Sequence, residues 1–429
     1  MSPTPKPALG AALASSGYTL SPEKYAKAVA FARARYRLHF AGFFWSVLVL
    51  VLLLRLRVAV RFRDRAEAFS KRRFLQASVF LPLFLLTQSL LELPPAILRH
   101  RVWLLYEQSV QGWGSWLWDR AKELLVATAV GIPIVWLLYA ILRRSPRRWW
   151  LLFWLALFPI LVFLIFLAPV AFDPLFFRFE RLGPRHPELA DSIERLTASV
   201  GVRIPPDRMF EMNASAKYRA LNAFVTGLGA SKRVVVWDTT IERMTVPETL
   251  FVFAHELGHY VLRHIPRTIV FLWALLFVLL AIAAAVLTRI LGRDASRGWG
   301  IRSLSDWASF PLLLLVLAVG SELALPVVNA YSRGQEHEAD VFALEAIHRI
   351  VPDSQRVAAQ AFQVLGEVSL DDPAPSPFIR FWLYSHPPLA ERLRFAAEHD
   401  PWGRGEPPRF GHRFAVGRFA TAPLGVACC

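Results

Sequence analysis

Two histidines and a glutamate stand at the spacing of a helical metal-binding motif in His255-Glu256-Leu257-Gly258-His259. Residues four apart share one helical face, so the imidazoles of His255 and His259 can reach one tetrahedral metal ion. Glu256 is turned by about 100° from His255, too far to join that face easily. It can instead accept a proton from a water that the metal activates. The alternative is a helix that carries two surface histidines by chance.

The residues before this motif predict the helix that positions it. Thr245-Val246-Pro247-Glu248 is a capping box with a proline in the first turn, which is a typical helix start. Apolar residues then lead to His255. The pattern therefore predicts that one helix carries both histidines.

A zinc site with two histidines needs a third protein ligand and keeps a fourth position open for water. Candidates gather downstream in Glu336-His337-Glu338-Ala339-Asp340. In a helix Glu336 and Asp340 share a face, so one can bind the metal while the other orients a histidine through its second ring nitrogen. The alternative is an acidic helix face in water.

The composition predicts an integral membrane protein. Of the 429 residues, 55% are hydrophobic, and several apolar runs approach the length that spans a bilayer. Six spans are expected, at residues 41–60, 74–98, 124–142, 149–172, 268–288 and 308–331. The last two form a hairpin that returns the chain to the same side, so Glu336 can meet the histidines.

The net charge of +16 comes mostly from arginines in the turns between the spans, where they can contact lipid headgroups and set the topology. No basic patch interleaved with aromatic residues stands out, so nucleic-acid binding is not expected. Glu92 and Glu322 interrupt two spans and could line an internal chamber or make hydrogen bonds between helices. Cys428 and Cys429 end the chain and could be lipidated or belong to a disordered end.

Several smaller elements are expected around the spans. Residues 21–38 predict an amphipathic helix, and the tryptophan-rich segment 112–118 predicts an interfacial loop. Residues 173–241 form the main soluble insertion, with a helix at 186–200 and a hairpin of strands at 222–226 and 233–237 around Gly227-Leu228-Gly229. Further helices are expected at 335–350 and 388–398.

Four motifs together resemble the CAAX prenyl protease 1 family, membrane-integral gluzincin zinc metalloproteases, in a compact bacterial form. They are the helical motif at 255–259, Ser332-Arg333-Gly334-Gln335-Glu336-His337-Glu338-Ala339-Asp340, Asn222-Ala223-Phe224-Val225-Thr226-Gly227, and Tyr384-Ser385-His386-Pro387-Pro388-Leu389-Ala390-Glu391-Arg392-Leu393. The resemblance implies a predominantly α-helical, polytopic membrane chamber with a zinc-metalloprotease domain that carries a small β-hairpin edge.

The resemblance also implies roles for single residues. His255, His259 and Glu336 would bind one Zn²⁺, Glu256 would be the general base, and Asp340 would support a ligand. His386 would help to hold the tetrahedral oxyanion, and Arg392 would line the cleft. Asn222, Ala223 and Phe224 would bind substrate on an edge strand.

The expected division of the chain is 1–172 with four spans, 173–267 with the hairpin and the zinc helix, 268–331 as a transmembrane hairpin, and 332–429 with the third ligand and a catalytic tail. The expected function is hydrolysis of peptide bonds near the C-terminus of prenylated or hydrophobic polypeptides. A quality-control protease for membrane proteins and a non-catalytic, zinc-stabilised scaffold are the alternatives. By resemblance the zinc site faces the cytoplasm from the plasma (inner) membrane, but the arginine-rich turns at 61–73, 143–148 and 293–302 favour the opposite orientation.

Overall fold

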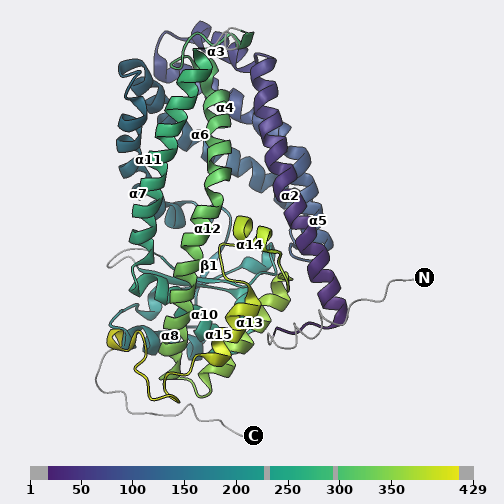
Figure 1. The fold of residues 1–429 in the computed structure, drawn as a ribbon, viewed down its shortest axis with the longest axis vertical. Helices are drawn as coiled ribbons and strands as arrows, with labels where there is room; N and C mark the ends of the chain where they lie inside the picture. The colour runs from purple at the N-terminus through teal and green to yellow at the C-terminus, as the bar shows by residue number, and fades with distance from the viewer. Residues whose placement is uncertain (1–17, 227–231, 293–297, 415–429) are drawn as a thin grey trace, which may run out of the picture.

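The computed structural model describes residues 18–226, 232–292 and 298–414. Long helices run along the long axis of the molecule, and a smaller part with a sheet and short helices lies at one end (Figure 1). Among the described residues, five helices are long and apolar enough to cross a membrane, and Trp149–Phe163 is a shorter apolar stretch. The long helices are α2 (Pro22–Arg55), α4 (Arg73–Leu91), α6 (Trp113–Arg144), α7 (Trp149–Ala171), α11 (His264–Leu291) and α12 (Phe310–His348).

The predicted spans are helical, with three differences. The amphipathic segment and the first span form the single helix α2. The second span breaks at Glu92, where α4 ends and α5 (Leu93–Leu105) begins, because Pro94 and Pro95 suit the first turn of a new helix better than the interior of an old one. The predicted loop at 112–118 is wrong, since α6 begins at Trp113, while the position of these tryptophans at the membrane interface stays a prediction.

The packed interior of the membrane helices is aromatic. Phe80 and Phe84 of α4 lie against Phe310 of α12, and Trp307 contacts both Phe80 and Tyr139. Large apolar side chains also point outward, as on a surface that faces lipid; Leu125, Val278 and Leu323 are examples. At the end of the molecule far from the sheet, α3 (Val58–Phe69) crosses the bundle (Figure 1).

The two acidic residues of the spans differ in their surroundings. Glu322 accepts hydrogen bonds from His39 of α2 at 3.0 Å and from Trp382 of α14 (Pro377–Leu383) at 2.9 Å, so it links three helices. Glu92 lies at the break between α4 and α5, and its buried Oε1 finds no hydrogen-bond partner in the described part of the chain. The interhelical role therefore applies to Glu322.

The sheet has four strands in the order β1-β2-β4-β3. They are β1 (Phe179–Arg181), β2 (Met209–Met212), β3 (Ala223–Thr226) and β4 (Arg233–Trp237). The predicted hairpin strands are confirmed, because β3 and β4 pair antiparallel with Ala223 opposite Val236. Its predicted turn, Gly227-Leu228-Gly229, lies outside the described residues, as do Cys428 and Cys429. Among the described strands, β3 is at the edge of the sheet.

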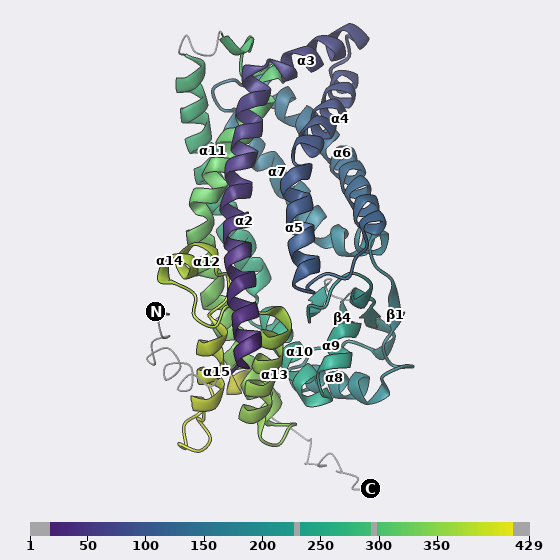
Figure 2. The ribbon, with the colours of Figure 1, turned by 90° about the vertical axis from the view of Figure 1, so that its right-hand side faces the viewer.

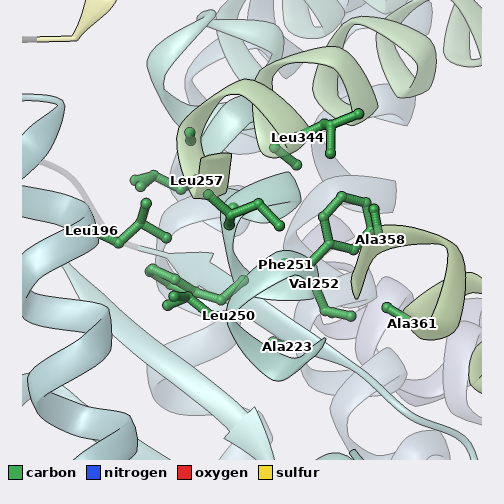
Figure 3. Packing of buried hydrophobic residues seen from close by; sticks show 14 of the residues in the cluster. Leu196, Ala223, Leu250, Phe251, Val252, Leu257, Leu344, Ala358 and Ala361 are labelled. Carbon is green, nitrogen blue, oxygen red and sulfur yellow. The ribbon is translucent and has the colours of Figure 1, made fainter. Parts of the chain in front are cut away.

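The core of the smaller part surrounds α10 (Val246–Val261), the helix of the histidine motif. Leu250, Phe251 and Leu257 of α10 meet Leu196, Ala223, Leu344 and Ala358 (Figure 3). These residues belong to α8 (Pro187–Ser199), β3, α12 and α13 (Ser354–Ser369), while α9 (Asp238–Arg243) precedes α10 and α15 (Leu389–Glu398) packs on α13. The expected helices at 186–200 and 388–398 are confirmed as α8 and α15, and the one at 335–350 is the last part of α12.

Candidate metal centre

The helix start predicted for the histidine motif is present in full. The Thr245 side chain accepts from the backbone N–H of Glu248, and the Glu248 carboxylate accepts from the backbone N–H of Thr245 at 2.8 Å. Two otherwise unpaired N–H groups are thereby satisfied, which fixes where α10 begins. Packing of the apolar face of α10 then fixes its rotation, and His255 and His259 face α12.

Three potential metal ligands converge between α10 and α12. His255 Nε2 lies 3.1 Å from His259 Nε2 and 3.1 Å from Glu336 Oε2, and His259 Nε2 lies 3.5 Å from Glu336 Oε1. One ligand atom from each residue falls within 4.8 Å of the others. Two nitrogens that bind one tetrahedral zinc ion lie about 3.3 Å apart. The spacing and chemistry of these donors therefore fit zinc.

The second ring nitrogen of His255 is held by a carboxylate. His255 Nδ1 lies 2.8 Å from Asp340 Oδ1, so this nitrogen donates and Nε2 is left to point at the metal position. Asp340 accepts two further hydrogen bonds from Arg392, at 2.9 Å and 2.6 Å. The sequence left open which of Glu336 and Asp340 would bind metal, and in the structure Glu336 is the one that joins the histidine nitrogens.

The second ring nitrogen of His259 is held differently, by a residue that the sequence analysis missed. His259 Nδ1 lies 3.0 Å from Nδ1 of His264, and His264 Nε2 donates to Glu338 Oε2 at 3.1 Å. Arg263 has a left-handed φ of 58°, and this turn starts α11 at His264 and brings its ring back to α10. The available signal was a third histidine just after the motif, at a helix boundary.

The charges of the site respond to burial and to each other. Burial opposes protonation of His255, but its bonds to Asp340 and Glu336 prevail and raise its pKa to about 10. Burial and the neighbouring His255 lower the pKa of His259 to about 4. The imidazole pair therefore carries one positive charge near neutral pH, on His255, and a metal cation that binds both Nε2 atoms displaces the extra proton. Burial raises the pKa of Glu256 to about 7.

The C-terminal motif reaches the same centre. His386, between α14 and α15, has its Nε2 3.2 Å from Glu336 Oε2, and its Nδ1 lies 2.9 Å from the Ser385 hydroxyl. The side chain of His386 is 54% exposed, but the protein around its ring removes part of its hydration and lowers its pKa, which favours the neutral form. The motifs at 255–259, 332–340 and 384–393 thus meet at one place.

The predicted substrate strand borders a cavity beside this centre. The backbone N–H of Asn222 donates to Thr240 Oγ1 at 2.8 Å, which fixes the chain just before β3. Ala223 is fully buried, whereas Asn222 is exposed and Phe224 half-buried. Asn222, His386 and Arg392 all line a cavity of about 730 Å³.

Two family models match this chain. Residues 184–400 match the family model of peptidase family M48, and residues 12–178 match that of the CAAX prenyl protease N-terminal region, with five membrane helices. An uncharacterized metalloprotease, YhfN of Bacillus subtilis, is 33% identical over 332 residues, which cover 76% of this chain and 75% of that protein.

More distant relatives are eukaryotic. CAAX prenyl protease 1 of Saccharomyces cerevisiae is 27% identical over 292 residues, which cover 65% of this chain and 62% of the yeast protein. The crystal structure of S. mikatae Ste24p superposes with a TM-score of 0.74 over 89% of this chain and 90% of that one, at 23% identity. The expected fold, a membrane helical chamber with a small sheet, is therefore confirmed.

Proposed function

The chain belongs to peptidase family M48 and is a multi-pass membrane metalloprotease, and from this premise we propose that it is a zinc endopeptidase that cuts prenylated or otherwise hydrophobic polypeptides near their C-termini. The substrate class is supported by the name of the yeast relative, CAAX prenyl protease 1, and by an active centre joined to membrane helices. We further propose that the zinc site faces the cytoplasm from the inner membrane.

The observation that carries this proposal is the convergence of His255, His259 and Glu336, each on a rigid helix. Each histidine is also oriented by a hydrogen bond to its other ring nitrogen. Bound there, zinc would supply a Lewis acid that polarises the scissile carbonyl and lowers the pKa of the attacking water. The remaining catalytic roles, proton transfer and stabilisation of the oxyanion, belong to protein side chains.

Glu256 has the position and the proton affinity of a general base. It follows His255 directly and is therefore turned away from the face of α10 that carries both histidines, and it is not one of the three converging donors. Burial raises its pKa above the ordinary glutamate value, which favours its accepting a proton from the attacking water and returning it to the leaving amine. Neutral His386 offers an N–H beside Glu336, where it can stabilise the oxyanion of the tetrahedral intermediate.

Replacing Glu256 with glutamine tests the catalytic role. Glu256→Gln keeps the size of the side chain but removes the base, so cleavage of a farnesylated or hydrophobic peptide should fall by about 10²- to 10⁴-fold. Bound zinc, measured by elemental analysis, should stay at the wild-type level because no metal ligand is changed.

The matched control is Glu242→Gln, an exposed glutamate on the neighbouring helix α9, which should cleave at the wild-type rate. Wild-type cleavage by Glu256→Gln would refute the mechanism. Purified wild-type protein that holds no zinc would refute the metal centre.

A further inference from the structure

The 730 Å³ cavity extends from the metal centre to the membrane helices. On one side it is lined by Asn222, His386 and Arg392, and on the other by side chains of α2 and α5, which lie next to each other (Figure 2). Leu325 and Leu383 are among its apolar walls. Its volume is within the range of pockets that enclose a ligand, about 300–1,000 Å³. It can therefore hold a short apolar segment of chain next to the scissile bond.

Two guanidinium groups on the α2 and α5 side have unused capacity for hydrogen bonds. Arg35 of α2 forms an ion pair with Asp371, with Nη2 3.7 Å from Oδ1, too long for a direct hydrogen bond, and its buried Nε has no hydrogen-bond partner among the described residues. Arg99 of α5 is exposed toward the cavity, and no acidic partner for it occurs among the described residues.

The other basic groups of this cavity are already paired. Arg392 is bound to Asp340, and His39 is bound to Glu322. Of the described residues, Asp371 is the one acid that lines it. Asp371 balances the charge of Arg35, so Arg99 leaves one positive charge in excess next to an apolar wall, and both guanidinium groups keep N–H donors to offer. This suits a ligand with an anionic end and apolar side chains.

The sheet gives the direction in which a peptide would enter. β3 runs from Ala223 to Thr226 at the sheet edge, and its partner β4 is antiparallel to it. An added strand that also pairs antiparallel runs from the Thr226 end toward Asn222. Since Asn222 lines the cavity, the C-terminal side of such a peptide leaves β3 at the cavity entrance.

We propose that Arg35 and Arg99 bind the free C-terminal carboxylate of the substrate, so that the enzyme measures its cleavage site from the end of the polypeptide. This inference rests on the proposed cleavage near C-termini and adds the group that recognises the terminus. Apolar side chains of the last residues fill the cavity between the metal centre and the two arginines. An internal peptide bond lacks the anion that these residues neutralise.

The test compares two peptides of identical apolar sequence, one ending in a free carboxylate and one in a carboxamide. Binding is measured by fluorescence anisotropy on the full-length Glu256→Gln protein loaded with zinc, so that no cleavage interferes. The free acid should bind at least about tenfold more tightly, as expected for charge-assisted hydrogen bonds. In Arg99→Gln the ratio between the two peptides should fall toward one.

Arg101→Gln is the matched control, because Arg101 is an exposed arginine on the same helix that does not line the cavity, and it should keep the wild-type ratio. Arg35→Gln should lower the ratio as Arg99→Gln does. Arg35→Lys, which retains the charge with fewer donors, should give an intermediate ratio and so separates lost recognition from misfolding. Equal binding of acid and amide would overturn the proposal even if the enzyme cleaves both. If Arg99→Gln instead weakens binding only to phosphatidylglycerol vesicles, the arginines serve lipid and the proposal also fails.

Acid-selective binding without any cleavage by the wild-type protein would separate the two proposals. The carboxylate site would then stand, and the proposed protease activity would fail.

Discussion

At the scale of single residues, the two proposed histidine ligands, His255 and His259, differ in the hydrogen bonds that orient them. Asp340, fixed by Arg392, accepts directly from His255, whereas His259 donates to a neutral imidazole, His264, that in turn donates to Glu338. Glu338 is itself bound by Arg267 and Arg409, each at 3.1 Å. Both arrangements leave Nε2 free for metal, and the second depends on the buried ring of His264, which is 2% exposed.

Removing His264 should weaken metal binding without removing a ligand. In His264→Ala the Nδ1–H of His259 loses its acceptor, so zinc affinity should fall by about 10- to 100-fold, as for other residues that orient a ligand. Competition with a chromophoric chelator measures this directly, independent of activity. His264→Gln, which can still accept a hydrogen bond, should recover part of the affinity.

His337→Ala is the control for this change, since His337 is an exposed histidine beside Glu336 and outside the converging donors. An unchanged zinc affinity in His264→Ala would show that His264 only fills space.

At the scale of elements, the site depends on how closely α10 and α12 approach. A Cβ at Gly258 would lie 2.9 Å from the Phe342 ring and 3.4 Å from the Ala339 backbone. Gly258 lies between the two ligands of α10, and Ala339 lies between Glu336 and Asp340. Only a glycine allows this contact, and the contact sets the distance between the histidines and the glutamate.

Gly258→Ala should therefore separate the two helices. We expect a loss of stability of about 1–3 kcal/mol from overpacking, seen as a lower melting temperature, together with weaker zinc binding. Adding Phe342→Leu should restore part of both, because it removes the ring that the new methyl group meets.

Gly334→Ala on α12 is the matched control, since nothing lies within 4 Å of its Cβ position, and it should not lower the melting temperature. A Gly258→Ala protein with wild-type stability and zinc affinity would show that α10 and α12 can shift without cost.

Elements with strong local signals were predictable, and those made by distant contacts were not. The capping box fixed the start of α10, and the periodicity of residues 186–200 fixed α8. By contrast, β2 is a strand because it pairs with β4 in parallel, and β1 because it pairs with β2. Because this pairing joins segments that are distant in the sequence, the three or four residues of each strand do not predict it by themselves. His264 was missed for the same reason, because its role exists only once α11 folds back on α10.

At the scale of the whole molecule, the structure bears on the conflict over orientation. Arginines at the end far from the sheet are engaged with the protein: Arg63 forms a buried ion pair with Asp306 at 2.7 Å, Arg302 binds Glu67 at 2.9 Å, and Arg57 donates to the Gly298 carbonyl at 2.9 Å. These arginines have structural partners, so their number is weaker evidence for a cytoplasmic location than the sequence suggested.

We therefore expect the metal centre and the C-terminus on the cytoplasmic side. A reporter that is active only in the cytoplasm, fused to the C-terminus, should be active, and one fused in the turn at 145–148 should be silent. The reverse pattern would place the centre outside and exclude cytoplasmic substrates.

The continuity of α12 has a consequence for biosynthesis. Its 39 residues begin near one end of the molecule and carry Glu336 to the histidines at the other. A nascent chain that has emerged only as far as α10 holds two imidazoles and no carboxylate ligand. In the proposed site the third donor arrives after two more membrane crossings, so the three donors come together only once α11 and α12 have been inserted into the bilayer.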